Sequence, residues 1–279
     1  MKRRPTFLIA VMGFGFAFFY VPILSMIVYS FNASRLATVW AGFSTKWYLA
    51  LWHNAQVLKA LTLSVEIALI SATCATILGT MAGLALARMG RFRGRVLFSG
   101  LVTAPLIMPE VITGISSLIF FILLGHYLGW PAQRGMATVT LSHITFSMVF
   151  VTRIVQARLT ETDRAIEEAA MDLGSKPWQV LFDVTLPIIS PAILAGWLLA
   201  FTISLDDVVI TSFTTGPGNT TLPLLIWSKV KLGVTPDVNA LATLIVLTVG
   251  ICVAVAGVFM RRAERMREAD MRMAYRANE

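Results

Sequence analysis

Charged residues are scarce in this sequence, and their scarcity excludes a water-soluble globular protein. Only 14% of the 279 residues are charged and 57% are hydrophobic, whereas soluble domains contain about a quarter charged residues. The mean hydropathy is +0.75. Too few polar side chains remain to cover the outside of a soluble fold, so most of the chain must lie in a lipid bilayer.

Cysteine, histidine and nucleotide-binding motifs are also nearly absent. The two cysteines, Cys74 and Cys252, lie inside apolar runs, where they act as small hydrophobic residues. The three histidines, His53, His126 and His143, are scattered and match no zinc motif such as H-E-x-x-H. Neither a G-x-S-x-G elbow nor a G-x-x-x-x-G-K-[ST] phosphate loop occurs. We therefore expect no catalytic residues, no metal site, no bound cofactor and no enzymatic activity.

Long apolar runs are abundant, and they predict an all-α integral membrane protein with six spans. The expected spans are residues 7–29, 61–87, 97–124, 137–157, 187–213 and 239–260. Each can cross a hydrocarbon core of about 30 Å, and each must be helical because lipid offers no partner for free backbone groups. The first run is too long for the apolar core of a cleaved signal peptide. Residues 1–279 are expected to form a single transmembrane domain.

Prolines interrupt two of these spans. Pro105 and Pro109 lie in the third, and Pro187 and Pro191 open the fifth. Proline frees backbone carbonyls and bends helices, which is tolerated at membrane depth beside protein or a water-filled path. From the sequence, each break is either a simple packing kink or a functional hinge.

Basic residues fall mainly on one side of the predicted spans. If the N-terminus is cytoplasmic, 17 of the 23 Lys and Arg residues lie inside, as the positive-inside rule requires. Both termini are then cytoplasmic. The net charge of +8 therefore reflects the membrane topology and contact of the basic residues with anionic lipid head groups. No nucleic-acid partner is expected.

The longest polar connection, residues 158–186, predicts a helix, a glycine turn and a second short helix. Thr162 or Asp163 can cap the first helix, Gly174 suits the left-handed residue after its end, and Pro177 suits the first turn of the next helix. One apolar stripe is formed by residues spaced i, i+3, i+4 and i+7, namely Ile166, Ala169, Ala170 and Leu173. Periodicity alone favours an amphipathic connector resting on the head groups.

The spacing within this loop resembles a motif of ABC importer permeases. Glu168-Ala-Ala-Met-Asp-Leu-Gly174 and Val184-Thr-Leu-Pro187 match the EAA loop position by position, with Val184 in place of the usual isoleucine. The resemblance implies the type I ABC importer permease fold, with a cytoplasmic coupling helix that docks on a separate ATPase subunit. That subunit, and not this chain, would bind the ATP. The implied coupling residues are Glu168, Ala169, Ala170, Asp172, Gly174, Leu186 and Pro187.

Further segments resemble the spermidine/putrescine permease branch, and especially the second permease of putrescine importers. These segments are Tyr29–Asn32, Trp40–Ser44, Ala104–Gly114, Leu205–Val208 and Thr215–Pro223. The resemblance implies a subunit that translocates polyamines from periplasm to cytoplasm across the bacterial inner membrane. Implied partners are a homologous second permease in a heterodimer, an ATPase dimer and a periplasmic polyamine-binding protein. The alternative is a self-contained secondary transporter or channel for organic cations.

Acidic residues inside the spans independently favour a cationic substrate. Glu66, Glu110, Asp206 and Asp207 lie within predicted spans, and no Lys or Arg lies deep enough to pair with them. Intramembrane acids are costly and mark ion or substrate paths. Glu66 lies near an outer end, which favours snorkelling or a local hydrogen bond. Glu110 either lines the path or binds backbone freed by Pro109. Asp206 and Asp207 point about 100° apart on a helix, so they cannot both face the path equally.

Overall fold

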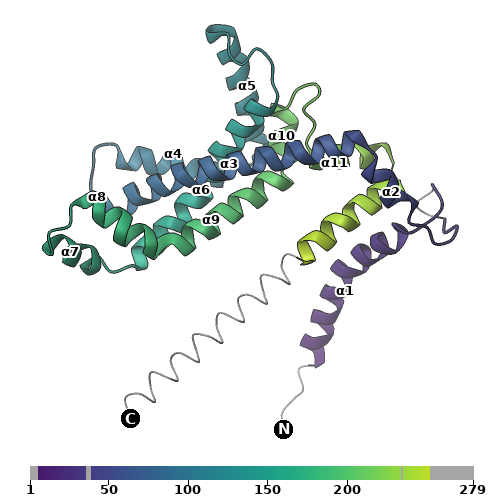
Figure 1. The fold of residues 1–279 in the computed structure, drawn as a ribbon, viewed down its shortest axis with the longest axis horizontal. Helices are drawn as coiled ribbons and strands as arrows, with labels where there is room; N and C mark the ends of the chain where they lie inside the picture. Colours follow the sequence, from purple (N-terminus) through teal and green to yellow (C-terminus); the bar gives the residue numbers. More distant parts are fainter. Residues whose placement is uncertain (1–5, 36–38, 234, 252–279) are drawn as a thin grey trace. The chain divides into compact units, whose positions relative to one another are not determined.

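The structure, a computed structural model, describes residues 6–35, 39–233 and 235–251 (Figure 1). Within these ranges the chain is helical apart from connecting segments and one isolated antiparallel bridge between Asn32 and Phe43. The chain divides into two compact units. One comprises residues 1–54 and 229–279, and the other comprises residues 55–228.

The first unit contains α1 (Thr6–Tyr29), α2 (Lys46–Trp52) and a helix at Pro236–Ile251. The predicted first span, 7–29, coincides with the apolar helix α1. The described part of the predicted sixth span is helical, and the rest of that span, 252–260, lies outside the described residues.

A buried asparagine organises the connection that follows α1. The Asn32 amide donates to the Val39 carbonyl at 2.7 Å, and its oxygen accepts from the Ala41 backbone N–H at 2.9 Å. The Trp47 indole N–H donates to the Asn32 carbonyl at 2.7 Å. Two of the segments that resemble the spermidine/putrescine permease branch, 29–32 and 40–44, therefore form one folded loop.

The second unit contains the remaining elements. In chain order these are α3 (Ala55–Arg88), α4 (Arg95–Ile107), α5 (Glu110–Leu128), α6 (Met136–Glu161), α7 (Ala165–Asp172), α8 (Pro177–Gln179), the π-helix η1 (Val180–Thr185), α9 (Leu186–Asp206) and α10 (Val209–Thr214), with the start of α11 (Leu222–Leu232). In the described residues, five helices are long and apolar enough to cross a membrane: Phe7–Tyr29, Ala55–Arg88, Glu110–Leu128, Met136–Glu161 and Pro177–Asp206.

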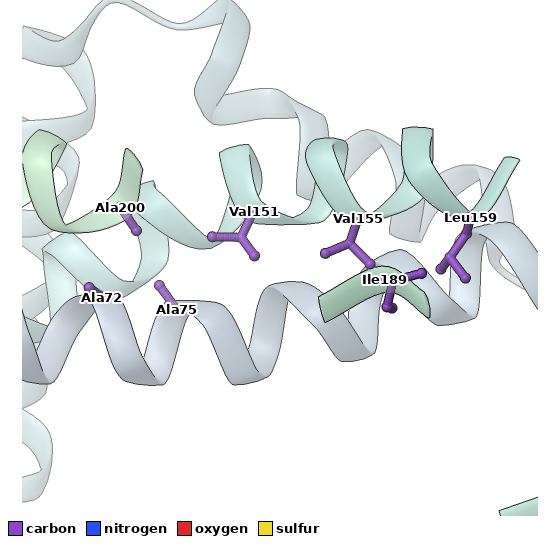
Figure 2. Packing of buried hydrophobic residues seen from close by; sticks show 7 residues of the cluster. All are labelled: Ala72, Ala75, Val151, Val155, Leu159, Ile189 and Ala200. Carbon is purple, nitrogen blue, oxygen red and sulfur yellow. The ribbon is translucent and has the colours of Figure 1, made fainter. Parts of the chain in front are cut away.

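Helices α3, α6 and α9 pack side by side and form the core of this unit (Figure 1). Figure 2 shows its fully buried cluster, with Ala72 and Ala75 from α3, Val151, Val155 and Leu159 from α6, and Ile189 and Ala200 from α9.

Glycines let the three backbones approach closely. A β-carbon on Gly79 would lie 2.7 Å from the Met148 carbonyl oxygen, and one on Gly196 would lie 3.1 Å from the Val151 side chain. The β-carbon added at Gly79 would also lie 2.7 Å from the Val151 side chain. Small residues at such contacts are the usual basis of helix packing in membranes, where the hydrophobic effect between helices is weak.

Two predicted spans are interrupted, and their predicted continuity over 97–124 and 187–213 is corrected. The third span breaks between α4 and α5 because Met108, which precedes Pro109, is extended (φ −80°, ψ 136°), as residues before proline tend to be. The fifth breaks after Asp206, where Asp207 is extended (ψ 129°) before α10 begins. Both breaks fall inside branch-type segments, 104–114 and 205–208.

Candidate functional site

The loop between α6 and α9 folds as the sequence predicts. Asp163 rather than Thr162 caps α7, since its carboxylate accepts the Ala165 backbone N–H at 3.0 Å. Gly174 has φ +91° and closes the helix in a Schellman motif: its N–H donates to the Met171 carbonyl at 2.9 Å, and the Ser175 N–H donates to the Ala170 carbonyl at 3.1 Å.

The second short helix, α8, begins at Pro177 as predicted. The side-chain oxygen of Gln179 accepts a hydrogen bond from the Lys176 backbone N–H at 2.8 Å and so gives this N–H, at the start of the helix, a partner. The π-helix η1 then leads directly into α9. π-helical turns of this kind often lie at functional positions.

The loop is attached to the bundle by its polar side. Glu167 accepts from the Arg88 guanidinium, with its Oε1 atom 3.1 Å from Nη2 and 3.2 Å from Nε. The same oxygen accepts from the Thr185 hydroxyl at 3.1 Å. Arg164 donates to the Ala87 carbonyl at 2.7 Å. One carboxylate on α7 thus joins the end of α3 to the last residue of η1.

Sequence reasoning missed Glu167 as an anchor and singled out its neighbour Glu168. Glu168 is exposed on α7. Because it is the next residue along the helix, its side chain points away from the direction of Glu167. Neither acid belongs to the predicted apolar stripe of this helix, and nothing in the sequence identifies Arg88, 79 residues earlier than Glu167, as the partner.

The other side of the loop is apolar and exposed. Leu173 is 89% exposed, Trp178 59% and Phe182 61%. Among the predicted coupling residues, Glu168, Ala169, Asp172 and Gly174 are exposed and Ala170 is half-buried. An apolar surface next to small residues is suited to docking another protein.

The last two predicted coupling residues have a different setting. Leu186 packs against the buried cluster of α3, α6 and α9, whereas Pro187 is exposed in the first turn of α9. Residues 168–174 therefore lie in the exposed part of the loop apart from the half-buried Ala170, whereas Leu186 and Pro187 lie at the junction of the loop with the bundle.

The acidic candidates of the spans separate into two kinds. Asp207 is mostly buried and engaged: it accepts the Thr211 backbone N–H and hydroxyl, each at 2.7 Å, and lies 3.2 Å from His143 Nε2. It thereby supports the start of α10. Asp206, Glu110 and Glu66 are exposed. The structure brings Asp206 and Asp207 together only as sequence neighbours.

His143 is a buried polar centre that sequence reasoning did not select. Its Nδ1 atom lies 2.7 Å from the Ser204 hydroxyl, and its Nε2 atom lies 3.1 Å from the Thr211 hydroxyl. Ser71 of α3 donates to Ser204 at 2.8 Å. The network joins α3, α6, α9 and α10 at the break of the fifth span. A usable signal existed, because a polar ring inside an apolar span is costly without partners.

The connection 215–223 is packed against the bundle. The Leu222 backbone N–H donates to the Ser64 hydroxyl at 2.7 Å, and Thr138 donates to the Thr214 carbonyl at 2.7 Å. Arg134 donates to the Phe213 carbonyl at 3.0 Å. These contacts lie at the ends of α3 and α6 opposite Arg88 and the loop 158–186.

No group of three His, Cys, Asp or Glu side chains in the described ranges is arranged to hold a metal ion.

A family model settles the class of protein. The model described as the inner membrane component of binding-protein-dependent transport systems matches residues 75–272. This chain belongs to that family. The permease is therefore a transport subunit of the inner membrane, and the matched region includes the second part of α3, all of α6 and α9, the loop 158–186 and the broken spans.

Named relatives cover nearly the whole permease. It is 53% identical over 273 residues, 98% of this chain and 97% of the relative, to the putrescine transport system permease protein PotI of Escherichia coli strain K12. It is 44% identical over 232 residues, 83% of this chain and 85% of the relative, to the spermidine/putrescine transport system permease protein PotC of the same organism.

Solved structures share the fold. A chain of a bacterial ABC transporter that imports the acidic polysaccharide alginate aligns with a TM-score of 0.71 at 16% identity, covering 92% of the permease and 97% of that chain. A chain of the MetNI methionine ABC transporter aligns with a TM-score of 0.62 at 16% identity, covering 77% and 97%. The predicted all-α importer-permease fold is confirmed.

Proposed function

We propose that this permease is the transmembrane subunit of an ATP-driven importer that moves polyamines from periplasm to cytoplasm. The observation that carries the proposal is the 53% identity to a putrescine permease over 98% of the chain. The lower identity to a spermidine/putrescine permease, 44% over 83% of the chain, favours putrescine as the substrate.

The loop 158–186 supports coupling to a separate ATPase dimer. Its α7 helix carries four of the predicted coupling residues, of which Glu168, Ala169 and Asp172 are exposed, and the exposed apolar side chains of Leu173, Trp178 and Phe182 follow in the same loop. A nucleotide-binding partner closing on this surface would push on α7, and the chain itself would bind no nucleotide. This side of the bundle, and both termini with it, would be cytoplasmic.

The opposite end of the bundle supports docking of a periplasmic polyamine-binding protein. The loop 215–223 is held in place there by Ser64, Thr138 and Arg134. A second, homologous permease would complete the membrane domain by covering α5, most of whose apolar side chains are exposed in this chain.

The substrate path is proposed to follow the exposed carboxylates Glu110 and Asp206. An ammonium group compensates an intramembrane carboxylate that has no Lys or Arg nearby. Asp207 has a different setting, because its carboxylate already accepts hydrogen bonds from Thr211 and lies against His143. Among the three acids predicted to line the path, we assign Asp207 to holding α10 and the other two to the cation.

The test is ATP hydrolysis by the complex reconstituted with its ATPase, second permease and binding protein in liposomes. Putrescine, spermidine and a panel of amino acids are added in turn. We expect hydrolysis and uptake to rise with putrescine and to remain at the basal level with amino acids. Stimulation by an amino acid instead, or proton-driven uptake by this chain alone, would refute the proposal.

A further inference from the structure

A cleft of about 470 Å³ opens beside α5, between that helix, the end of α4 and α6. Small-molecule sites typically occupy about 300–1,000 Å³. Hydroxyl groups of Thr113, Ser116, Ser117, Ser142 and Thr145 line it. The lining is mainly apolar, with Pro105, Met108 and Leu141 beside the aromatic rings, and these hydroxyl-bearing residues are its polar part.

Three of these hydroxyls are available to a ligand. Thr145 donates to the Leu141 carbonyl and Ser142 to the Thr138 carbonyl, each at 2.9 Å, as is common within helices. Within the part of the chain that the structure describes, the hydroxyls of Thr113, Ser116 and Ser117 form no hydrogen bond. Unpaired hydroxyls are costly against lipid, so this wall of the cleft must face water, a partner or a polar ligand.

A carboxylate lies on the same face of α5. Glu110 begins this helix directly after the break at Pro109, and Thr113 and Ser117 follow it at i+3 and i+7, the spacing of one helical face. Gly114, beside this face, packs against the Phe213 ring of α10 and fixes the rotation of α5. Glu110 is exposed and does not line the cleft itself; it lies one helical turn before the lining residue Thr113.

Aromatic rings close the other end of the same face. Phe120 and Phe121 line the cleft, and their rings lie 5.5 Å apart, edge to face. Such rings suit methylene groups and attract cations to their faces. The sequence of groups along α5 is thus carboxylate, hydroxyls, then aromatic rings.

We propose that this cleft binds one end of an aliphatic diamine during its passage through the membrane, which rests on the proposed function. The Glu110 carboxylate accepts from the ammonium group, the hydroxyls of Thr113 and Ser117 replace part of its hydration shell, and Phe120 and Phe121 contact the methylene chain. A neutral diol of the same length lacks the charge that Glu110 recognises and does not bind.

The first test measures putrescine uptake by the reconstituted complex at saturating binding protein. Thr113→Val combined with Ser117→Ala removes the two free hydroxyls that follow Glu110 on its helical face, and we expect uptake to fall about tenfold, because hydrogen bonds to a charged group are lost. Thr145→Val is the matched control: it lines the same cleft, but its hydroxyl is already used within α6. We expect its uptake to stay close to that of the unmodified complex. Basal ATP hydrolysis, measured in parallel, reports correct assembly.

The second test detects the ligand in the cleft directly. A Ser117→Cys complex is treated with a positively charged methanethiosulfonate reagent, in the presence of putrescine or of butanediol. We expect putrescine to slow the labelling and butanediol to leave it unchanged. Equal uptake by the double variant and the Thr145→Val control, or equal protection by diamine and diol, overturns the site. If the unmodified complex imports no diamine at all, the proposed function fails and the site fails with it.

Discussion

The carboxylate of Glu167 offers the sharpest test of the proposal that the loop 158–186 transmits force from an ATPase. It joins Arg88 at the end of α3 to Thr185 at the end of η1 through one oxygen atom. The two side chains of the ion pair are only 17% and 16% exposed, so water screens the pair less than it would at the surface. We predict that Glu167→Gln loosens the loop from the bundle.

The expected magnitude follows from these contacts. A hydrogen bond to a charged group contributes about 1.5–3 kcal/mol, and the amide side chain of the Glu167→Gln variant would retain a neutral contact to Thr185. A net loss of about 2 kcal/mol corresponds to a shift of roughly 30-fold in the equilibrium between attached and detached loop. Closure of the ATPase would then move α7 without moving α3 and α9. We therefore expect basal ATP hydrolysis to persist and uptake per ATP to fall about tenfold.

The assay is paired measurement of ATP hydrolysis and putrescine uptake by the reconstituted complex. Glu161→Gln is the matched control, because its carboxylate is 71% exposed and forms only a 3.7 Å pair with Arg158. Reversal of both charges, Glu167→Arg with Arg88→Glu, is expected to restore part of the coupling. If Glu167→Gln kept the unmodified ratio of uptake to ATP, the proposed route of force through this residue would be refuted.

The remaining predictions concern packing, the loop turn and the buried network. Gly79→Ala would destabilise the purified permease by about 1–3 kcal/mol in denaturant or thermal unfolding, because the new β-carbon meets the backbone of α6; Gly100→Ala, whose β-carbon meets nothing within 4 Å, is the control. Gly174→Asp should insert and assemble normally but lose uptake, since φ +91° disfavours a side chain there. His143→Ala should lower stability by about 1–3 kcal/mol, because the buried Ser204 and Thr211 hydroxyls lose their hydrogen bonds to the ring, and His143→Asn should recover part of it.

Each of these has a clear contrary result. Equal unfolding midpoints for the two alanine variants would contradict the close approach of α3 and α6. Unchanged uptake by the Gly174→Asp complex would count against α7 as the coupling helix. A His143→Ala permease as stable as the unmodified one would show that the network holds nothing together.

Local sequence signals predicted local structure well. Gly174 and Pro177 mark the end of α7 and the start of α8 because backbone conformation at a helix end depends on the residue itself. The first span was predictable because lipid permits only helices across its core. The position of Pro109 predicted a bend in the third span, whereas in the structure the helix ends at Ile107 and a new helix begins at Glu110.

The assignment of roles to polar residues was not predictable in the same way. Helical periodicity placed Glu167 and Glu168 outside the apolar stripe, but only the fold brings Arg88 and Thr185 to the first of them. The adjacent acids Asp206 and Asp207 were known to diverge, and only packing shows that His143 and Thr211 engage the second.

By itself, the sequence determined that the protein lies in a lipid bilayer, where its helical spans fall, and where the short helices of the loop end and begin. These properties depend on composition and on interactions over a few residues. Only the tertiary structure decided which acid anchors the loop, which histidine is buried and which hydroxyls face the cleft. The physical reason is distance along the chain: the contacts of Glu167 with Arg88 and of His143 with Ser204 join residues 79 and 61 positions apart, and helix packing alone sets those pairs.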